Sequence, residues 1–104
     1  MQRVAFALPI KPEKVDEYRR THANPWPELL EENTKAGIRN YTIVLFGHHV
    51  IGLLECEDWD KAITYLGQSE VQARWQKLHE DILDVDMSSG LVPFQMLDEI
   101  FHQD

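Results

Sequence analysis

The amino-acid sequence predicts an α+β fold of the ferredoxin-like, split-βαβ type, in which a four-stranded antiparallel sheet carries helices on one face. The first observation behind this prediction is the order of the segments, which is strand, helix pair, hairpin, helix pair and strand. The second is size, since the chain has 104 residues, of which 43% are hydrophobic. That is the length and composition of one domain, so we expect residues 1–104 to fold as a single unit.

The first third of the chain is expected to contain one strand and two short helices. Residues 4–10 form a short apolar run typical of a buried strand, and residues 13–23 have the composition of a helix. The prolines of Asn24-Pro25-Trp26-Pro27 push the residues before them toward extended geometry, so the first helix should end there. Pro27 suits the first position of a second helix, and Gly37 suits its left-handed end.

The middle of the chain is expected to form a hairpin followed by a helix. Residues 40–46 and 50–56 are rich in residues that favour strands, and Gly47-His48-His49 between them indicates a tight turn. Asp58 is placed to cap a helix over residues 59–66.

The last third is expected to contain one longer helix and a final strand. After a break at Gly67, a helix should run over residues 69–83, because apolar side chains recur there with helical spacing. This stripe consists of Val71, Trp75, Leu78 and Ile82. Residues 84–90 read as a polar loop, and residues 92–101 read as a strand interrupted by Pro93.

Charge and composition exclude several classes of partner. Ten Lys and Arg against 18 Asp and Glu give a net charge of −8, which disfavours nucleic acids and anionic membrane surfaces. No apolar stretch approaches the ~18 residues of a membrane span, and no signal peptide is recognisable. The single cysteine, Cys56, cannot form an intrachain disulfide, so we expect a cytoplasmic protein. So small a domain also leaves one sheet face uncovered, and we expect a homodimer.

The first helix carries the clearest candidate for chemistry. Its charged residues belong in water, whereas Val15, Tyr18 and His22 follow one stripe that must face the sheet. A tyrosine and a histidine that point inward could act as a general acid and base in a pocket between helix and sheet. Equally, both rings could fill the core and hydrogen-bond to the backbone.

Other candidate residues are ambiguous. Trp26, fixed between two prolines, could stack on the face of a sugar or could pin the second helix to the core. Glu28 could orient a neighbouring donor, but it suits a helix-start charge better. His79 is expected at the rim of the stripe around Trp75. The histidines and Cys56 lack the spacing of a metal site, so no metal is expected.

A set of short motifs spans the chain from its first strand to its last. In order they are Tyr18, His22-x-x-x-Trp26-Pro27-Glu28-Leu29, Asn40-Tyr41-x-Ile43, Trp75 and Leu97-x-Glu99-Ile100-Phe101. Together they resemble the L-rhamnose mutarotase family, and the His-x-x-x-Trp-Pro-Glu element is the most specific of them. The resemblance implies a dimeric α/β barrel of ferredoxin-like protomers, and an isomerase that interconverts sugar anomers without a metal or an organic cofactor.

The resemblance also implies roles for individual residues. His22 matches the proton donor, Tyr18 and Tyr41 match tyrosines that contact the substrate, and Trp75 matches the first of two adjacent tryptophans at the sugar. The chain departs from the family at Gln76, where a second tryptophan is usual. It departs again over residues 84–90, where the family usually has an Asn-Pro-Asp-Asn-Ser-Pro-like segment.

The sequence thus predicts a mutarotase for a 6-deoxy-L-hexose, either L-rhamnose or L-fucose. Such an enzyme opens the hemiacetal ring by moving one proton off the anomeric hydroxyl and one onto the ring oxygen. We expect His22 to act as the acid, with Tyr18 as its partner or as an anchor for the sugar, and the base is unassigned. The sugar would also contact Tyr41, Trp75, Gln76 and Trp26. The alternatives are a cofactor-free oxygenase of the same fold and a non-catalytic module that binds a small molecule.

Overall fold

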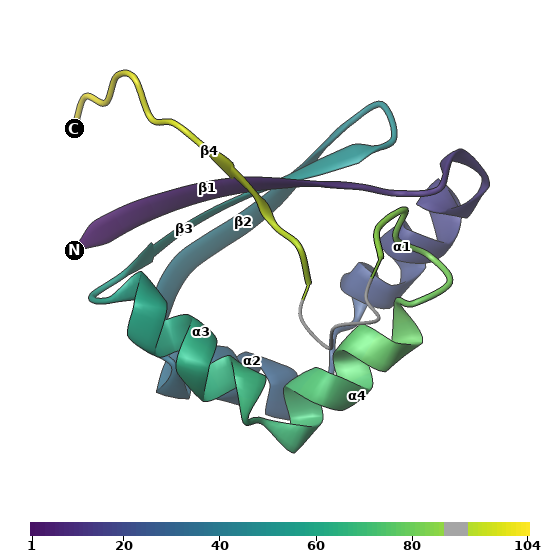
Figure 1. The fold of residues 1–104 in the computed structure, drawn as a ribbon, viewed down its shortest axis with the longest axis horizontal. Coiled ribbons are helices and arrows are strands. Elements are labelled where there is room, and N and C mark those ends of the chain that lie inside the picture. The colour runs from purple at the N-terminus through teal and green to yellow at the C-terminus, as the bar shows by residue number, and fades with distance from the viewer. Residues whose placement is uncertain (87–91) are drawn as a thin grey trace.

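The computed structural model describes residues 1–86 and 92–104, and it places the helices on one side of a four-stranded antiparallel sheet (Figure 1). The elements are β1 (Gln2–Pro9), the 3₁₀ turn η1 (Pro12–Lys14), α1 (Val15–Ala23), α2 (Pro27–Lys35), β2 (Ile38–Phe46), β3 (His49–Cys56), α3 (Trp59–Gly67), α4 (Glu70–Leu78) and β4 (Gln95–Leu97). The strand order β2-β3-β1-β4 confirms the predicted ferredoxin-like, split-βαβ topology. None of the described helices is long and apolar enough to cross a membrane.

The core lies between the sheet and the helices. Side chains alternate between the two faces of a strand, so every second residue of β1 and β3 points toward the helices. These buried residues are Val4, Phe6, Leu8, Val50, Leu54 and Cys56. Cys56 is a free, fully buried thiol that acts as a small core residue, as expected.

Prolines, glycines and capping residues set the predicted ends of the elements. Pro27 is the first residue of α2, and Gly37 follows that helix with a φ of +88°. Gly47, with a φ of +62°, forms the turn between β2 and β3, where few residues other than glycine fit. Asp58 and Ser69 each accept a hydrogen bond, at 3.2 Å, from the backbone N–H three residues on.

The last helix is shorter than predicted. It ends at Leu78 and not near Leu83, and Leu78, expected on the inner stripe, is 45% exposed. The chain leaves the helix because the residues that follow pair with the end of β1. The N–H of Asp84 donates to the carbonyl of Pro9 at 2.9 Å, and Leu83 forms an isolated β-bridge with Ile10.

The final strand is also shorter than the predicted range of 92–101. Only Gln95–Leu97 forms a ladder with β1, which ends at the pair of Ala5 and Leu97. Pro93 has no N–H to extend the ladder at its start. The chain continues past the sheet in an extended form (yellow in Figure 1), with Phe101 exposed. Of the predicted polar loop, residues 87–90 lie outside the described residues.

Candidate active site

A cavity of about 900 Å³ lies between the inner face of the sheet and helices α2, α3 and α4. Its volume is in the range of pockets that bind small molecules. Four of the six residues predicted to act on the substrate line this cavity, and they come from three separate parts of the chain. They are His22, Tyr41, Trp75 and Gln76.

His22 stands in the last turn of α1, and its contacts define which ring nitrogen carries hydrogen. Nδ1 lies 2.9 Å from the backbone oxygen of Tyr18. A carbonyl oxygen only accepts hydrogen bonds, so Nδ1 must be the protonated nitrogen and must donate. The hydrogen bonds of the His22 ring to described residues involve Nδ1, and none of these residues has a buried side-chain nitrogen or oxygen without a partner. Nε2 is therefore not sealed in the core, and because His22 lines the cavity we infer that Nε2 faces it. In the neutral ring, Nε2 therefore offers a lone pair to whatever occupies the cavity.

Aromatic rings hold His22 on several sides. The ring of Tyr18 stacks on it, with centroids 4.0 Å apart and planes inclined by 19°, and Trp75 meets it edge to face at 5.3 Å. Trp26 in turn packs edge to face on Trp75 at 5.1 Å. Tyr18 and Trp26 are not among the described residues that line the cavity. Both therefore support the rings of His22 and Trp75 from outside the described lining, which favours packing over an acid–base role for Tyr18 and over sugar stacking for Trp26.

Burial keeps the two phenols of the site protonated. It raises the pKa of Tyr18 to about 12. It also raises the pKa of Tyr41, and the nearby phenol of Tyr18 acts on it in the same direction. At neutral pH both hydroxyls remain hydrogen-bond donors, because desolvation disfavours the phenolate form, although the Tyr41 side chain as a whole is 40% exposed in this chain.

Burial has the opposite effect on the imidazole of His22. It lowers the pKa of His22 from its ordinary 6.5, the hydrogen bond to the Tyr18 carbonyl opposes this, and repulsion from His79 adds to it. At neutral pH the ring is therefore neutral, so its free nitrogen accepts a proton before it donates one.

His79 corrects the sequence prediction, which placed it at the rim. It is 3% exposed, and its Nδ1 donates to the backbone oxygen of Trp75 at 2.8 Å. Its Nε2 lies 2.9 Å from Oγ1 of Thr21, a residue that the sequence did not single out. Helical spacing could have predicted the burial of His79. A residue four positions after Trp75 lies on the same helical face as Trp75, and that residue is His79 and not Leu78.

Two other candidates are placed as follows. Gln76 is half-buried beside Trp75 and lines the cavity, so its amide can reach a ligand. Glu28 is exposed in the first turn of α2, which fits the helix-start charge rather than a role in the site.

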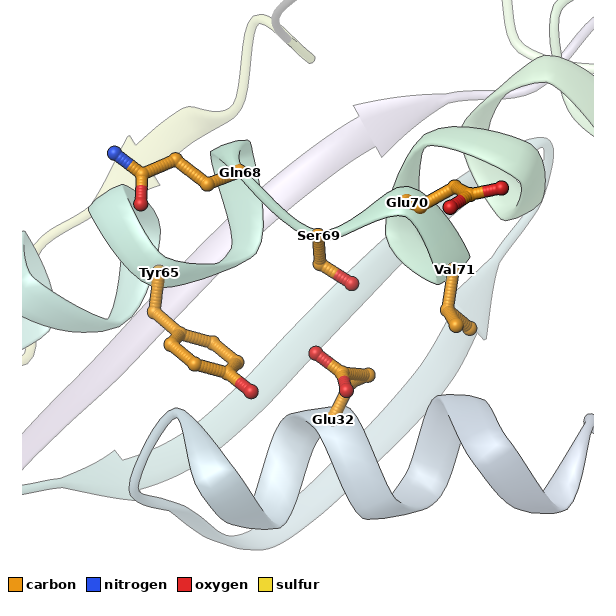
Figure 2. A pocket seen from close by; sticks show the side chains of 6 residues that line it. All are labelled: Glu32, Tyr65, Gln68, Ser69, Glu70 and Val71. Carbon is orange, nitrogen blue, oxygen red and sulfur yellow. The ribbon is translucent and has the colours of Figure 1, made fainter.

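A second, smaller hollow of about 360 Å³ lies where α2 faces the junction of α3 and α4. Figure 2 shows the Tyr65 hydroxyl and the Glu32 carboxylate pointing toward each other across it. Burial and the hydrogen bond to Glu32 raise the pKa of Tyr65. This hollow contains no histidine among its described lining residues, and its titratable side chains are two carboxylates and a phenol. Within residues 1–86 and 92–104, no three or more His, Cys, Asp and Glu side chains are grouped to hold a metal ion.

Comparison with known proteins connects the fold to a family. The sequence profile described as L-rhamnose mutarotase matches residues 3–103. The chain is 30% identical to the L-rhamnose mutarotase of Oceanobacillus iheyensis over the full length of both chains. It is 34% identical to that of Burkholderia cenocepacia over 98% of each.

Solved structures share the same fold. The L-rhamnose mutarotase FA22100 from Formosa agariphila superposes over the whole of both chains with a TM-score of 0.85, at 20% identity. Tetracenomycin F2 cyclase from Streptomyces glaucescens, a type-II polyketide cyclase, matches all of this chain and 98% of its own, with a TM-score of 0.60 at 15% identity. At these identities the likeness concerns the fold alone.

Proposed function

This chain belongs to the L-rhamnose mutarotase family of sugar isomerases, and we propose that it interconverts the α and β anomers of a 6-deoxy-L-hexose, with L-rhamnose preferred. The observation that carries the proposal is the free Nε2 of a neutral His22 at the wall of a cavity of about 900 Å³. The same wall presents the indole of Trp75 and the phenol of Tyr41, which suit the apolar face and the hydroxyls of a neutral sugar.

His22 transfers the proton in both halves of ring opening. Its neutral Nε2 accepts the proton of the anomeric hydroxyl, whose oxygen forms the aldehyde as the bond between C1 and the ring oxygen breaks. The ring oxygen leaves with that electron pair and takes the proton back from His22. After rotation about C1–C2 the reverse steps close the ring on the other face, so no net proton is gained or lost. In this scheme His22 acts first as the base toward the anomeric hydroxyl. The protonated ring then acts as the expected proton donor to the ring oxygen.

The tyrosines assist without giving up their protons. Because burial raises the pKa of both phenols, the Tyr41 hydroxyl stays a donor and can hydrogen-bond the ring oxygen as negative charge develops there. Tyr18 stacks on His22 and holds its ring at the orientation that transfer requires.

Saturation-transfer NMR on the two sugars tests the substrate. L-rhamnose and L-fucose differ in the configuration of ring hydroxyls, and the Gln76 amide lies where it can contact those hydroxyls. We expect the protein to raise the rate of anomer exchange above the spontaneous rate for both sugars. The increase should be larger for L-rhamnose, because the chain belongs to the L-rhamnose mutarotase family. A faster rate with L-fucose would reassign the sugar, and the spontaneous rate in buffer without protein is the control.

The catalysed rate is expected to persist to a pH below 6.5, the ordinary pKa of histidine, and then to fall as the pH drops further. The pKa of His22 is lowered, so the neutral, accepting form persists somewhat below the ordinary value and is lost only as the pH drops through the lowered value. Tyr18 stacks on the His22 ring and Tyr41 lines the same cavity, and both stay protonated throughout. His79, whose pKa burial also lowers, is the other described group nearby that titrates in this range. Exchange rates between pH 5 and pH 8 check this. A rate that rises toward acid pH would mean that the imidazolium is the resting catalyst.

We also propose a homodimer formed through the outer face of the sheet. Cross-strand pairs place apolar or small side chains side by side on that face, with Ala5 between Leu53 and Leu97 and with Val44 opposite Ile51. Leu53 and Val44 are each 45% exposed. Side chains as small as alanine at the centre let a second sheet approach closely, and a contiguous apolar patch of this kind marks an interaction surface.

Replacing Leu53 with aspartate is expected to shift the protein from dimer to monomer, because it buries a charge in that interface. Sedimentation equilibrium at micromolar concentration measures the mass. Leu78→Asp is the matched control, since Leu78 is also 45% exposed but lies on α4, away from the sheet. A monomeric wild-type protein, or a dimeric Leu53→Asp variant, would contradict this assembly.

A further inference from the structure

A polar chain lies behind His22, on the side away from the cavity. Oγ1 of Thr21 is 2.9 Å from Nδ1 of His22 and 2.9 Å from Nε2 of His79. It thus connects a histidine at the end of α1 with one just after α4, although 58 residues separate Thr21 from His79 in the sequence. His79 is buried, and its other nitrogen is occupied by the Trp75 carbonyl.

The backbone carbonyls at the two ends of this chain determine where its protons lie. Nδ1 of each histidine faces a carbonyl oxygen, so each Nδ1 carries hydrogen and donates. In the neutral rings, Nε2 of His79 is then an acceptor, and the Thr21 hydroxyl must donate its hydrogen to it. The oxygen of Thr21 is left to share, with the Tyr18 carbonyl, the single hydrogen on Nδ1 of His22.

The Thr21 hydroxyl has a second acceptor within reach, the Tyr18 carbonyl, at 2.9 Å. If its hydrogen turned there, the lone pair of His79 Nε2 would face the lone pairs of Oγ1, an arrangement that a buried site disfavours. His79 therefore sets the direction of the hydroxyl, and the hydroxyl reinforces the donor role of His22 Nδ1.

We propose that Thr21 and His79 are positioning residues that hold His22 as the Nδ1–H tautomer, with the lone pair of Nε2 directed at the anomeric hydroxyl. The proposal rests on the proposed role of His22. Neither residue touches the sugar, because neither is among the described residues that line the cavity. Their effect reaches the reaction through the proton distribution and orientation of His22 alone.

Thr21→Val keeps the shape of the side chain and removes the hydroxyl. Removing a partner that orients a reactive histidine costs on the order of 10–100-fold where this has been measured in metal sites, and we expect about a ten-fold lower kcat for anomer exchange here. KM should change little, because the contacts to the sugar remain. Thr21→Ser is expected to recover most of the loss, and His79→Leu to lose as much as Thr21→Val without adding to it in the double variant.

The imidazole ¹⁵N resonances of His22 give a second readout that a general loss of packing would not move. Wild type should show a single Nδ1–H tautomer at pH 7.5, and Thr21→Val should show a weaker preference for it, because only the Tyr18 carbonyl remains as an acceptor for Nδ1. Thr64→Val is the matched control, because among the described residues the Thr64 hydroxyl donates to the Asp60 carbonyl of its own helix, α3, away from His22. It should leave both readouts unchanged.

The outcomes separate this proposal from the proposed function. A Thr21→Val variant with the wild-type tautomer and exchange rate would overturn the role of Thr21 and His79. A wild-type protein with the expected tautomer but no catalysed exchange would overturn the function and leave the positioning of His22 supported.

Discussion

Replacing His22 with alanine is expected to lower the catalysed rate of anomer exchange by about 10²–10⁴-fold, the usual contribution of a positioned acid or base. The free Nε2 of His22 is the proton acceptor that the cavity offers to the anomeric hydroxyl. The two phenols cannot replace it, because burial raises the pKa of each and leaves them as donors.

A matched pair of variants makes the result specific. His22→Gln keeps a polar group of similar size but cannot exchange a proton near neutral pH, so it should lose as much rate as His22→Ala. His49→Ala removes an exposed histidine at the hairpin, outside the described lining of the cavity, and should keep the wild-type rate. Catalysed exchange that survives in both His22 variants would remove His22 from the mechanism.

Replacing Gly52 with alanine is expected to destabilise the protein by about 3 kcal/mol, at the upper end of what overpacking a core costs. Gly52 of β3 pairs with Phe6 of β1, and a Cβ built there would lie 2.2 Å from Cζ of the Phe6 ring. The ring cannot easily move away, because Phe6 is 3% exposed and packs on Phe94 at a centroid distance of 4.5 Å.

Urea unfolding of the two forms measures this loss. Gly67→Ala is the control, because a Cβ at Gly67 meets nothing within 4 Å and Gly67 is the last residue of α3. The sequence predicts a helix break at this glycine, but Gly67 is part of the helix in the structure. Gly67→Ala should therefore be neutral or slightly stabilising. A Gly52→Ala protein as stable as the Gly67→Ala protein would show that Phe6 does not pack as described.

Local signals predicted the elements well where the constraint itself is local. Pro27, Gly37 and Gly47 act through their own backbone angles, so the start of α2, its end and the hairpin could be read from the sequence. The end of α4 could not be read this way. It depends on the pairing of Leu83 with Ile10, which are far apart in the chain, and a helical pattern of apolar residues carries no information about that pairing.

The residues of the candidate site also differ in how far the sequence could predict them. The inward direction of Tyr18 and His22 followed from helical spacing, whereas Tyr41, Trp75 and Gln76 came from the resemblance to a family. Of these five, the structure places all but Tyr18 among the described lining of one cavity. The partnership of Thr21 with His79 escaped prediction because it joins two helices, and only the packed fold shows that their side chains meet.

Saturation-transfer NMR of anomer exchange in L-rhamnose, with the wild-type protein, tests whether the protein catalyses mutarotation. We expect exchange well above the spontaneous rate at neutral pH, in proportion to the protein concentration and with no added metal or cofactor. Binding of the sugar with exchange at the spontaneous rate, for L-rhamnose and for L-fucose alike, would contradict it and would identify the chain as a sugar-binding module.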